Sequence, residues 1–246
     1  MDIATAQQRA VAQSVYYPAA KLSALGRADS NKYQTQFEVS NESTLSAARR
    51  IAQSGGTKLL CLNFASAKNP GGGFLGGAEA QEENLAKSSG LYPCIAQMTA
   101  LYEANSRLKS CIYLDDMIYS PNVPVFRDDQ YALTDDYFCT SIITAPAVNR
   151  GALEKNESAR VGEVESVMVR RIALLLDVAL HNGETRLVLG AWGCGVFGND
   201  AKDMARYFAK HLLENPVYAG AFKHISFAVL DRKNIGTYDA FREVFA

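Results

Sequence analysis

The segment KLLCLNFASAKNPGGGFLGGAEAQEENLAKSS, residues 58–89, combines three local patterns that predict a strand, a glycine-rich loop and a helix. Residues 58–64 form a short apolar run of strand length, and residues 81–89 have helical character. Between them lie five glycines in seven positions, from Gly71 to Gly77. Glycines allow the backbone to approach a ligand closely and expose N–H groups that can surround an anion. The segment therefore predicts a ligand site between a strand and a helix.

Two adjacent carboxylates, Glu82 and Glu83, stand at the N-terminal end of that predicted helix. Neighbouring helix residues point about 100° apart, unlike the facing carboxyls of ordinary retaining or inverting glycosidases. One carboxylate is better interpreted as an acid/base and the other as a substrate holder. An ordinary surface loop with glutamates that complement the helix dipole is the alternative. The glycines, Asn69-Pro70 and both carboxylates together, directly after a buried strand, favour the ligand site.

The rest of the chain alternates helical and strand patterns, with no internal repeat and no Pro/Gly/Ser-rich linker. Apolar spacing predicts helices over residues 43–53, 81–89, 92–104, 163–181, 199–213 and 236–244. Strands are predicted over residues 58–64, 111–119, 137–144, 186–192 and 224–230. This alternation indicates an α/β protein, a three-layer α/β/α sandwich with a mixed central sheet. Ligands of such sheets bind beyond the carboxyl ends of the strands, which directs attention to the loops after residues 64 and 192.

A single domain is predicted over residues 1–246, with residues 1–32 as an N-terminal helical extension without a recognisable motif. Residues 119–129 contain two prolines and are predicted to form a rigid loop at the rim of a cleft.

The second loop, GAWGCGVFGND at residues 190–200, contains a formal G-x-G-x-x-G at Gly193, Gly195 and Gly198. A dinucleotide-binding fingerprint of this kind has an acidic residue about 20 positions further on. The acid of the next predicted strand, Asp231, lies well beyond that distance. We therefore keep only the physical content, a glycine turn whose amides bind a diphosphate at a helix N-terminus. Two glycine turns, one with carboxylates, suggest a nucleoside diphosphate sugar as ligand.

The composition narrows the classes of protein. The 25 basic and 26 acidic residues leave a formal charge of -1, which argues against a stable duplex nucleic-acid partner or an anionic membrane surface. Five cysteines without a C-x-x-C pair, no secretory signal and no long apolar run predict a cytoplasmic protein. Three scattered histidines predict no metal site.

Both loops resemble those of one known family. GGG at residues 71–73, seven further residues and QEE at 81–83 resemble the GGG-x(6–8)-QEE signature of poly(ADP-ribose) glycohydrolases. The sequence G-x-W-G-C-G-x-F-G, residues 190–198, resembles the diphosphate loop of that family's macrodomain. The stretches NFASAKNPGGGF, IYSPNVPVFRDD and ITAPAVN are similar to the microbial branch, and the likeness extends from about Phe37 to Asp231. It implies a macrodomain that hydrolyses ribose–ribose O-glycosidic bonds and releases ADP-ribose, without cofactor or metal.

The resemblance also implies roles for individual residues. Glu83 corresponds to the catalytic acid/base, and Glu82 to the residue that holds hydroxyls of the ribose being cleaved. Asn63 and Asn69 lie where the family orients the distal ribose, Asn69 being the better match. Ser66 stands where vertebrate members have an asparagine, a departure that affects ribose holding. The substrate-binding residues expected in full are Asn69, Gly71, Gly72, Gly73, Gln81, Gly193, Cys194, Gly195, Val196, Phe197 and Phe227.

Within that set, the amides of residues 193–196 are expected to bind the diphosphate, and Phe197 is expected to pack against the distal ribose. Phe227 or Tyr238 is expected to stack on adenine, although aromatic residues in a terminal strand and helix are more often part of a core. Cys194 would be an alternative nucleophile at a helix N-terminus, but no histidine is placed to act as its base. It is better interpreted as a small loop residue.

Two other functions remain open at this point. The same pocket could hydrolyse mono-ADP-ribose from modified protein or nucleic acid, or the chain could be a non-catalytic ADP-ribose-binding macrodomain. The intact Gln-Glu-Glu argues against the non-catalytic alternative, because a binding module needs neither carboxylate. The expected ligand is ADP-ribose or poly(ADP-ribose), the expected substrates are ADP-ribosylated macromolecules, and the protein is expected to be a monomer that contacts no membrane.

Overall fold

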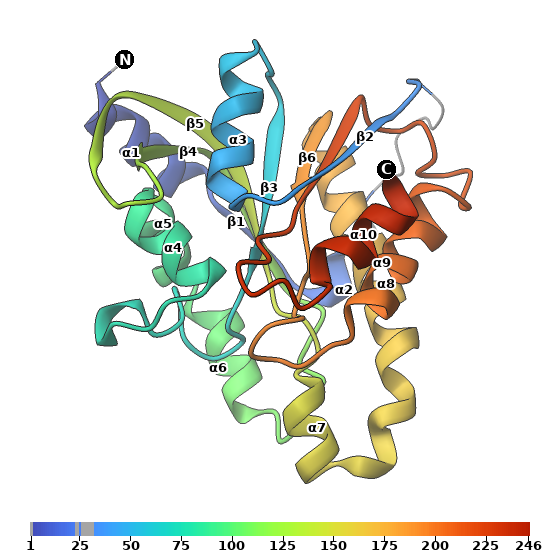
Figure 1. Ribbon diagram of the computed structural model, residues 1–246. Helices are drawn as coiled ribbons and strands as arrows, with labels where there is room; N and C mark the ends of the chain where they lie inside the picture. Colours follow the sequence, from blue (N-terminus) through green and yellow to red (C-terminus); the bar gives the residue numbers. More distant parts are fainter. Residues whose placement is uncertain (1, 23–24, 26–31) are drawn as a thin grey trace.

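A mixed β-sheet forms the centre of the molecule. The computed structural model describes residues 2–22, 25 and 32–246, and in this part of the chain the sheet has seven strands in the order β1-β4-β5-β3-β6-β7-β2 (Figure 1). The strands are β1 (Val15–Tyr17), β2 (Gln36–Ser40), β3 (Leu59–Phe64), β4 (Met117–Arg127), β5 (Leu133–Ala145), β6 (Arg186–Leu189) and β7 (His224–Ala228).

The helices cover both faces of this sheet (Figure 1). They are α1 (Ile3–Gln13), α2 (Ala19–Leu22), α3 (Thr44–Gln53), α4 (Gln81–Ser88), α5 (Leu91–Ala96), α6 (Thr99–Arg107), α7 (Arg150–Asn156), α8 (Val164–His181), α9 (Ala201–Leu212) and α10 (Thr237–Phe245), with 3₁₀ turns at Phe74–Gly76 and Ser158–Glu163. Strands β5, β3, β6, β7 and β2 run parallel, whereas β4 and β1 are antiparallel to their neighbours. The prediction of a three-layer α/β/α sandwich with a mixed sheet is confirmed. None of the helices in the described part of the chain combines the length and apolarity needed to span a bilayer.

Strand β3 shows why the sheet is buried on both sides. Leu60 and Leu62 join the core beneath α8 and α9, whereas Leu59 and Cys61 join the core beneath α3 and α5. All four side chains are buried, as expected for a parallel strand with helices on both faces. Strand β3 lies between β5 and β6, so the loop that follows its carboxyl end starts from the middle of the sheet.

The bounds of strand β4 show that two predictions from the sequence were wrong. Most of the predicted strand over residues 111–119 is not a strand, and the predicted loop over residues 119–129 lies largely within β4. Pro121 fits into this strand because the pairing with β5 shifts register between Ser120 and Val123, whereas Pro124 stays in register opposite Cys139. Such bulges release the ladder hydrogen bonds that proline cannot make. The predicted helix over residues 92–104 is also divided, into α5 and α6.

The N-terminal segment contributes to the sheet as well as to the helical layer. Within residues 1–32, the structure has α1, α2 and the edge strand β1, which pairs antiparallel with β4. Residues 1, 23–24 and 26–31 of this predicted helical extension lie outside the described residues. Strands β1 and β2 were not predicted, because they have only three and five residues.

A fully buried arginine supports the cleft side of the fold. The Arg171 side chain, 0% exposed, donates to the carbonyls of Ile112 (3.0 Å), Tyr113 (3.2 Å) and Pro146 (2.8 Å). Its Nε also donates to Asp115 Oδ1 at 2.8 Å. Arg171 thereby holds a segment without regular structure against α8, since every carbonyl it binds belongs to the loops around β4 and β5.

Replacing Arg171 should therefore be costly. Arg171→Met leaves Asp115 largely buried without its inner partner and should lower the free energy of unfolding by about 3–5 kcal/mol. Arg170 is a matched control, because it binds the other oxygen of Asp115 at 2.8 Å while 53% exposed. Arg170→Met should cost no more than about 1 kcal/mol. Urea unfolding of both variants measures the difference, and equal losses would contradict a structural role for the buried arginine.

Candidate active site

Both glycine-rich loops start at the same edge of the sheet. The carbonyl of Ala145, at the end of β5, accepts a hydrogen bond from the N–H of Ala65 (3.3 Å) and another from the indole of Trp192 (3.1 Å). Ala65 begins the loop after β3, and Trp192 lies in the loop after β6. One backbone carbonyl thus joins the two loops that were expected to form the site.

Gln81 connects strand β3 to helix α4. Its Oε1 accepts from the N–H of Phe64 at 2.8 Å, and its Nε2 donates to the carbonyl of Leu62 at 2.7 Å and to Thr44 Oγ1 at 3.1 Å. The side-chain amide is therefore occupied by the protein itself. Gln81 was predicted to bind substrate, and this geometry corrects that prediction: Gln81 is a positioning residue.

Glu82 is buried, with 3% of its surface exposed. Its Oε2 accepts from the N–H of Ser66 at 2.6 Å, and its Oε1 accepts from Asn63 Nδ2 at 3.3 Å. Burial raises the pKa of Glu82 to about 8, against which these hydrogen bonds act, while the charge of Glu83 adds to the rise. The raised pKa favours the protonated form of Glu82, and a protonated carboxyl can both donate to and accept from a sugar hydroxyl.

Glu83 turns toward the glycine loop. Its Oε1 accepts from the N–H of Gly73 at 2.9 Å, and the side chain is 8% exposed. A Cβ at Gly72 would overlap Glu83 Oε1 and would lie 3.2 Å from Glu82 Oε2. Gly72 also has φ +63°, so glycine is required there both for space and for backbone conformation. Although neighbours on a helix diverge, both carboxylates therefore converge on one point of the loop.

The loop after β6 offers backbone donors to an anion. The N–H groups of Gly193, Gly195, Val196 and Phe197 donate to no acceptor among the described residues. The N–H of Cys194, in contrast, donates to the carbonyl of Ala191 at 3.1 Å. The prediction that Cys194 supplies an amide to the diphosphate is therefore corrected, because that donor closes a turn inside the loop.

Helix α9 begins directly behind this loop, capped by Asp200, whose carboxylate accepts from the N–H of Asp203 at 3.0 Å. Asn199 fixes the loop from below by donating to the carbonyls of Val148 (2.8 Å) and Gly193 (3.1 Å). Burial raises the pKa of the Cys194 thiol to about 12, which agrees with a packing role rather than a nucleophile.

Tyr113 is a site residue that the sequence did not indicate. Its ring lies against that of Phe197, with centroids 6.1 Å apart and planes at 47°. Tyr113 has φ +61°, an unfavourable conformation for a bulky residue that is held by the Arg171 hydrogen bond to its carbonyl. Such strained residues concentrate at functional sites. No local pattern could have revealed this, because the strain depends on a buried arginine 58 positions away.

Phe227 does not line the cleft. It is 0% exposed and packs against Phe208, Phe241 and Phe245, with ring centroids 4.3–5.4 Å apart. The prediction that Phe227 stacks on adenine is corrected, because both of its faces are covered by α9 and α10. The alternative, Tyr238, is partly exposed at the start of α10, and the guanidinium of Arg242 lies 5.6 Å from its ring centroid.

The asparagines differ in their surroundings. Asn69 is exposed, and its N–H donates to Ser66 Oγ at 3.1 Å, which leaves its side chain available to a ligand. Asn63 is fully buried beneath Glu82, and its Oδ1 has no hydrogen-bond partner among the described residues. Asn63 thus orients Glu82, whereas Asn69 stands at the surface of the loop. Among the described residues, no group of three or more His, Cys, Asp or Glu could hold a metal ion.

An α/β/α sheet with a glycine turn for an anion and two buried carboxylates at its strand ends is the arrangement of a glycoside-cleaving macrodomain. The family model described as microbial-type PARG, catalytic domain, matches residues 1–128. This chain belongs to the microbial-type poly(ADP-ribose) glycohydrolase family. Among curated proteins, no significant match is found.

Solved structures agree with this assignment. The poly(ADP-ribose) glycohydrolase of Thermomonospora curvata bound to the inhibitor ADP-HPD is 44% identical with a TM-score of 0.92, over 98% of this chain and 89% of that chain. The enzyme of Deinococcus radiodurans in complex with ADP-ribose is 42% identical with a TM-score of 0.90, over 98% and 96% of the two chains. A further structure of the T. curvata enzyme is 44% identical with a TM-score of 0.93, over 98% of this chain and 89% of that chain.

The burial of Glu82 predicts how stability depends on pH. Its pKa is about 8 in the folded protein against an ordinary value of 4.5. Below pH 4.5 both states hold the proton, and between 4.5 and 8 only the folded state does. Glu82 therefore makes the free energy of unfolding fall as pH rises, by up to about 1.4 kcal/mol per pH unit. Glu82→Gln removes this dependence.

The stability of Glu82→Gln relative to wild type should thus increase by about 2 kcal/mol or more between pH 5 and pH 8. Urea unfolding at several pH values measures it. Glu79→Gln is the matched control, because Glu79 is an exposed glutamate of the same loop, with a side chain 69% exposed. A pH-independent difference between Glu82→Gln and wild type would show that Glu82 does not hold the proton.

Proposed function

We propose that this protein hydrolyses the ribose–ribose O-glycosidic bonds of poly(ADP-ribose) and releases ADP-ribose, with Glu83 as the general acid/base. The observation that carries the proposal is the convergence of Glu82 and Glu83 on Gly72, at the sheet edge shared with the free amides of the second loop. The family membership and the relatives solved with ADP-ribose or ADP-HPD support the same substrate class.

In the proposed reaction, Glu83 donates its proton to the oxygen that leaves the anomeric carbon. The bond between that carbon and oxygen breaks while the sugar develops oxocarbenium character. The resulting carboxylate then takes a proton from a water molecule, whose oxygen bonds to the anomeric carbon. Glu83 is protonated again, and the products are free ADP-ribose and a shortened polymer with a free hydroxyl. The N–H of Gly73 fixes one carboxylate oxygen throughout this cycle.

Glu82 holds the ribose that is cleaved. Its raised pKa favours the neutral form, which reduces the negative charge beside Glu83. Asn63 and the N–H of Ser66 fix its orientation from the protein side. This arrangement also accounts for Ser66 in place of the vertebrate asparagine, because the contact to Glu82 comes from the backbone N–H and requires no particular side chain.

The diphosphate is proposed to bind the N–H groups of Gly193, Gly195 and Val196. These donors precede α9, whose N-terminal end adds a favourable dipole. Phe197, supported by Tyr113, packs against the distal ribose. Asn69 is proposed to contact the same ribose from the first loop.

We extend the proposal to organisation and location. Strand β1 pairs with β4, and α1 packs on the same strand, which supports one domain that includes the N-terminal segment. All five cysteines are free thiols, which supports a cytoplasmic location. The protein is proposed to act as a monomer on ADP-ribosylated macromolecules.

Replacing the acid/base tests the reaction directly. Glu83→Gln keeps the shape of the side chain and its acceptor for the Gly73 N–H but cannot transfer a proton. Turnover of poly(ADP-ribose) should fall by about 10³-fold or more, while calorimetry should show ADP-ribose affinity within about threefold of wild type. Glu79→Gln, in the same loop, should retain turnover. Substantial turnover by Glu83→Gln would refute the assignment of this residue.

The geometry of the glycine loop gives a second test. Gly72→Ala forces a methyl group into Glu83 and into a φ of +63°, so it should displace the carboxylate and reduce turnover by about 10²-fold or more. Gly76→Ala is the control, because a Cβ there meets no atom within 4 Å. Steady-state kinetics of both variants decide the matter, and similar activities would show that Glu83 does not depend on close approach to Gly72.

A further inference from the structure

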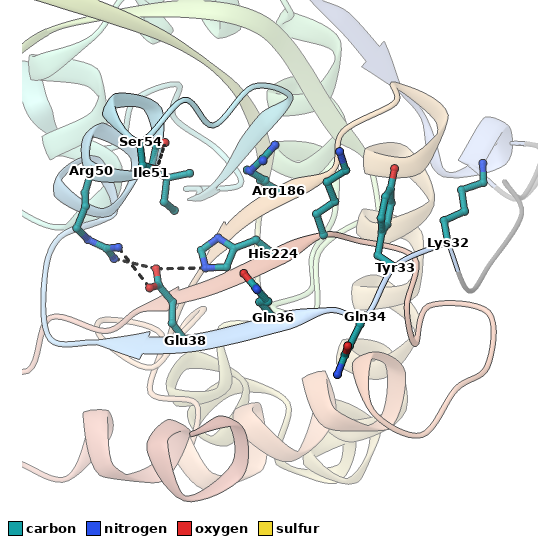
Figure 2. Close-up of a pocket in the computed structure, with 11 residues that line it drawn as sticks. Lys32, Tyr33, Gln34, Gln36, Glu38, Arg50, Ile51, Ser54, Arg186 and His224 are labelled. Atoms are coloured by element: carbon teal, nitrogen blue, oxygen red, sulfur yellow. Dashed lines mark hydrogen bonds and ion pairs between the residues drawn. The ribbon is translucent and has the colours of Figure 1, made fainter.

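A polar groove (Figure 2) lies where strands begin, at the opposite end of the strands from the two glycine loops. It has a volume of about 620 Å³ and sits where β2, β6 and β7 begin, whereas the proposed active site sits where β3, β5 and β6 end. Its charged lining residues are Lys32, Glu38, Arg50, Arg186, Lys223 and His224. Four cations thus line a single groove of a chain whose formal charge is -1.

The charges in this groove are not balanced locally. Among the described residues of the lining, Glu38 is the one carboxylate, and it binds Arg50 at 2.8 Å. No ion pair in the described part of the chain includes Lys32, Arg186 or Lys223. Three cationic side chains therefore face this groove without a carboxylate partner in the part of the chain that the structure describes, and an anionic ligand would supply one.

The polar contacts of two of these cations are with neutral groups. Arg186 donates from one nitrogen to the carbonyl of Thr57 at 2.9 Å, so its other donors remain available. The ammonium of Lys223 lies 5.3 Å from the ring centroid of Tyr33. Gln34 and Gln36 complete the lining with amides suited to hydroxyl groups. Cations, an aromatic ring and amides together fit a ligand that carries phosphates and ribose hydroxyls.

From this lining we infer that the groove binds diphosphate groups of a second stretch of the same poly(ADP-ribose) chain whose end occupies the active site. The inference rests on the proposed function, because that function supplies a polymer with two phosphates in every unit. Strand β6 links the two sites rigidly: Arg186 begins it, and the diphosphate loop follows it. The strand has four residues and spans roughly 13 Å.

Simultaneous contact at two rigidly connected sites raises the affinity for long chains without altering the affinity for one unit. Strand β2 is an edge strand of the sheet, so no further strand covers the groove on that side. The groove thus distinguishes long polymer from free ADP-ribose, which fills the catalytic site alone.

Removal of two groove charges tests the inference. Lys32→Gln/Lys223→Gln is made in the Glu83→Gln background so that polymer is bound without being cut. Both lysines are exposed, so the fold should be retained. The affinity for long poly(ADP-ribose) at low salt should fall about tenfold, while the affinity for ADP-ribose should stay within twofold. The slope of log affinity against log salt should become shallower by about 1.4, taking ~0.7 for each single-strand phosphate contact.

The matched control is Lys21→Gln/Lys155→Gln in the same background, which removes two exposed lysines outside the groove and outside both glycine loops. Equal loss of polymer affinity in both double variants would overturn the inference, as would an unchanged affinity. Displacement of the polymer from the groove by single-stranded DNA of equal charge, with equal potency, would overturn its assignment to poly(ADP-ribose). Failure of the Glu83→Gln parent to bind ADP-ribose would instead refute the proposed function and remove the basis of the inference.

Discussion

The side-chain amide of Gln81 fixes the end of β3 to the first turn of α4. It binds the N–H of Phe64 and the carbonyl of Leu62, two backbone groups at the point where the strand leaves the sheet. Glu82 and Glu83 follow Gln81 directly, so this clamp determines where both carboxylates stand. The glycine loop between strand and helix closes around them, because only a residue without a side chain fits beside Glu83 at Gly72.

That clamp places two carboxyl groups in a largely buried position, which is costly unless each is hydrogen-bonded or neutralised. The structure uses both solutions. The N–H groups of Ser66 and Gly73 each donate to one carboxyl, and the N-terminal end of α4 favours negative charge. Burial in turn raises the pKa of Glu82 to about 8. This difference supports the proposed division of roles, in which Glu82 holds the sugar and Glu83 exchanges a proton.

The parts of this arrangement that are local in the chain could be predicted from the sequence. Strand β3, both glycine loops and the two carboxylates lie in short segments whose pattern is complete in itself. The roles of Gln81 and the Cys194 amide could not be predicted, because each depends on which carbonyl or N–H the fold brings opposite. Strand β4 was obscured by two prolines, one of which lies at a bulge in the pairing with β5.

The sequence also could not predict which aromatic residues are buried in the core and which lie near the glycine-rich loops. The sequence places Phe227 on a strand but does not say which face of the sheet it occupies, and that face is the core beneath α9 and α10. Tyr113, in contrast, belongs to no motif, yet Arg171 holds its carbonyl and brings its ring to Phe197. Long-range contacts rather than residue type decide which aromatic side chain borders the cleft.

Backbone amides lie near Glu83, whereas charged side chains lie in the groove at the other end of the strands. The proton transfer proposed for Glu83 gives a physical reason for this difference. A cation placed beside an acid/base carboxyl favours its ionised form, which opposes proton donation to a leaving group. The amides that we propose bind the diphosphate, those of Gly193, Gly195 and Val196, avoid this conflict because they carry no formal charge. At the far edge no proton is transferred, so Lys32, Arg186 and Lys223 can present full charges there. If the proposed function and the inferred role of the groove hold, a chain of charge -1 binds a polyanion at two places by two different means, with the formal charges kept away from the reacting carboxyl.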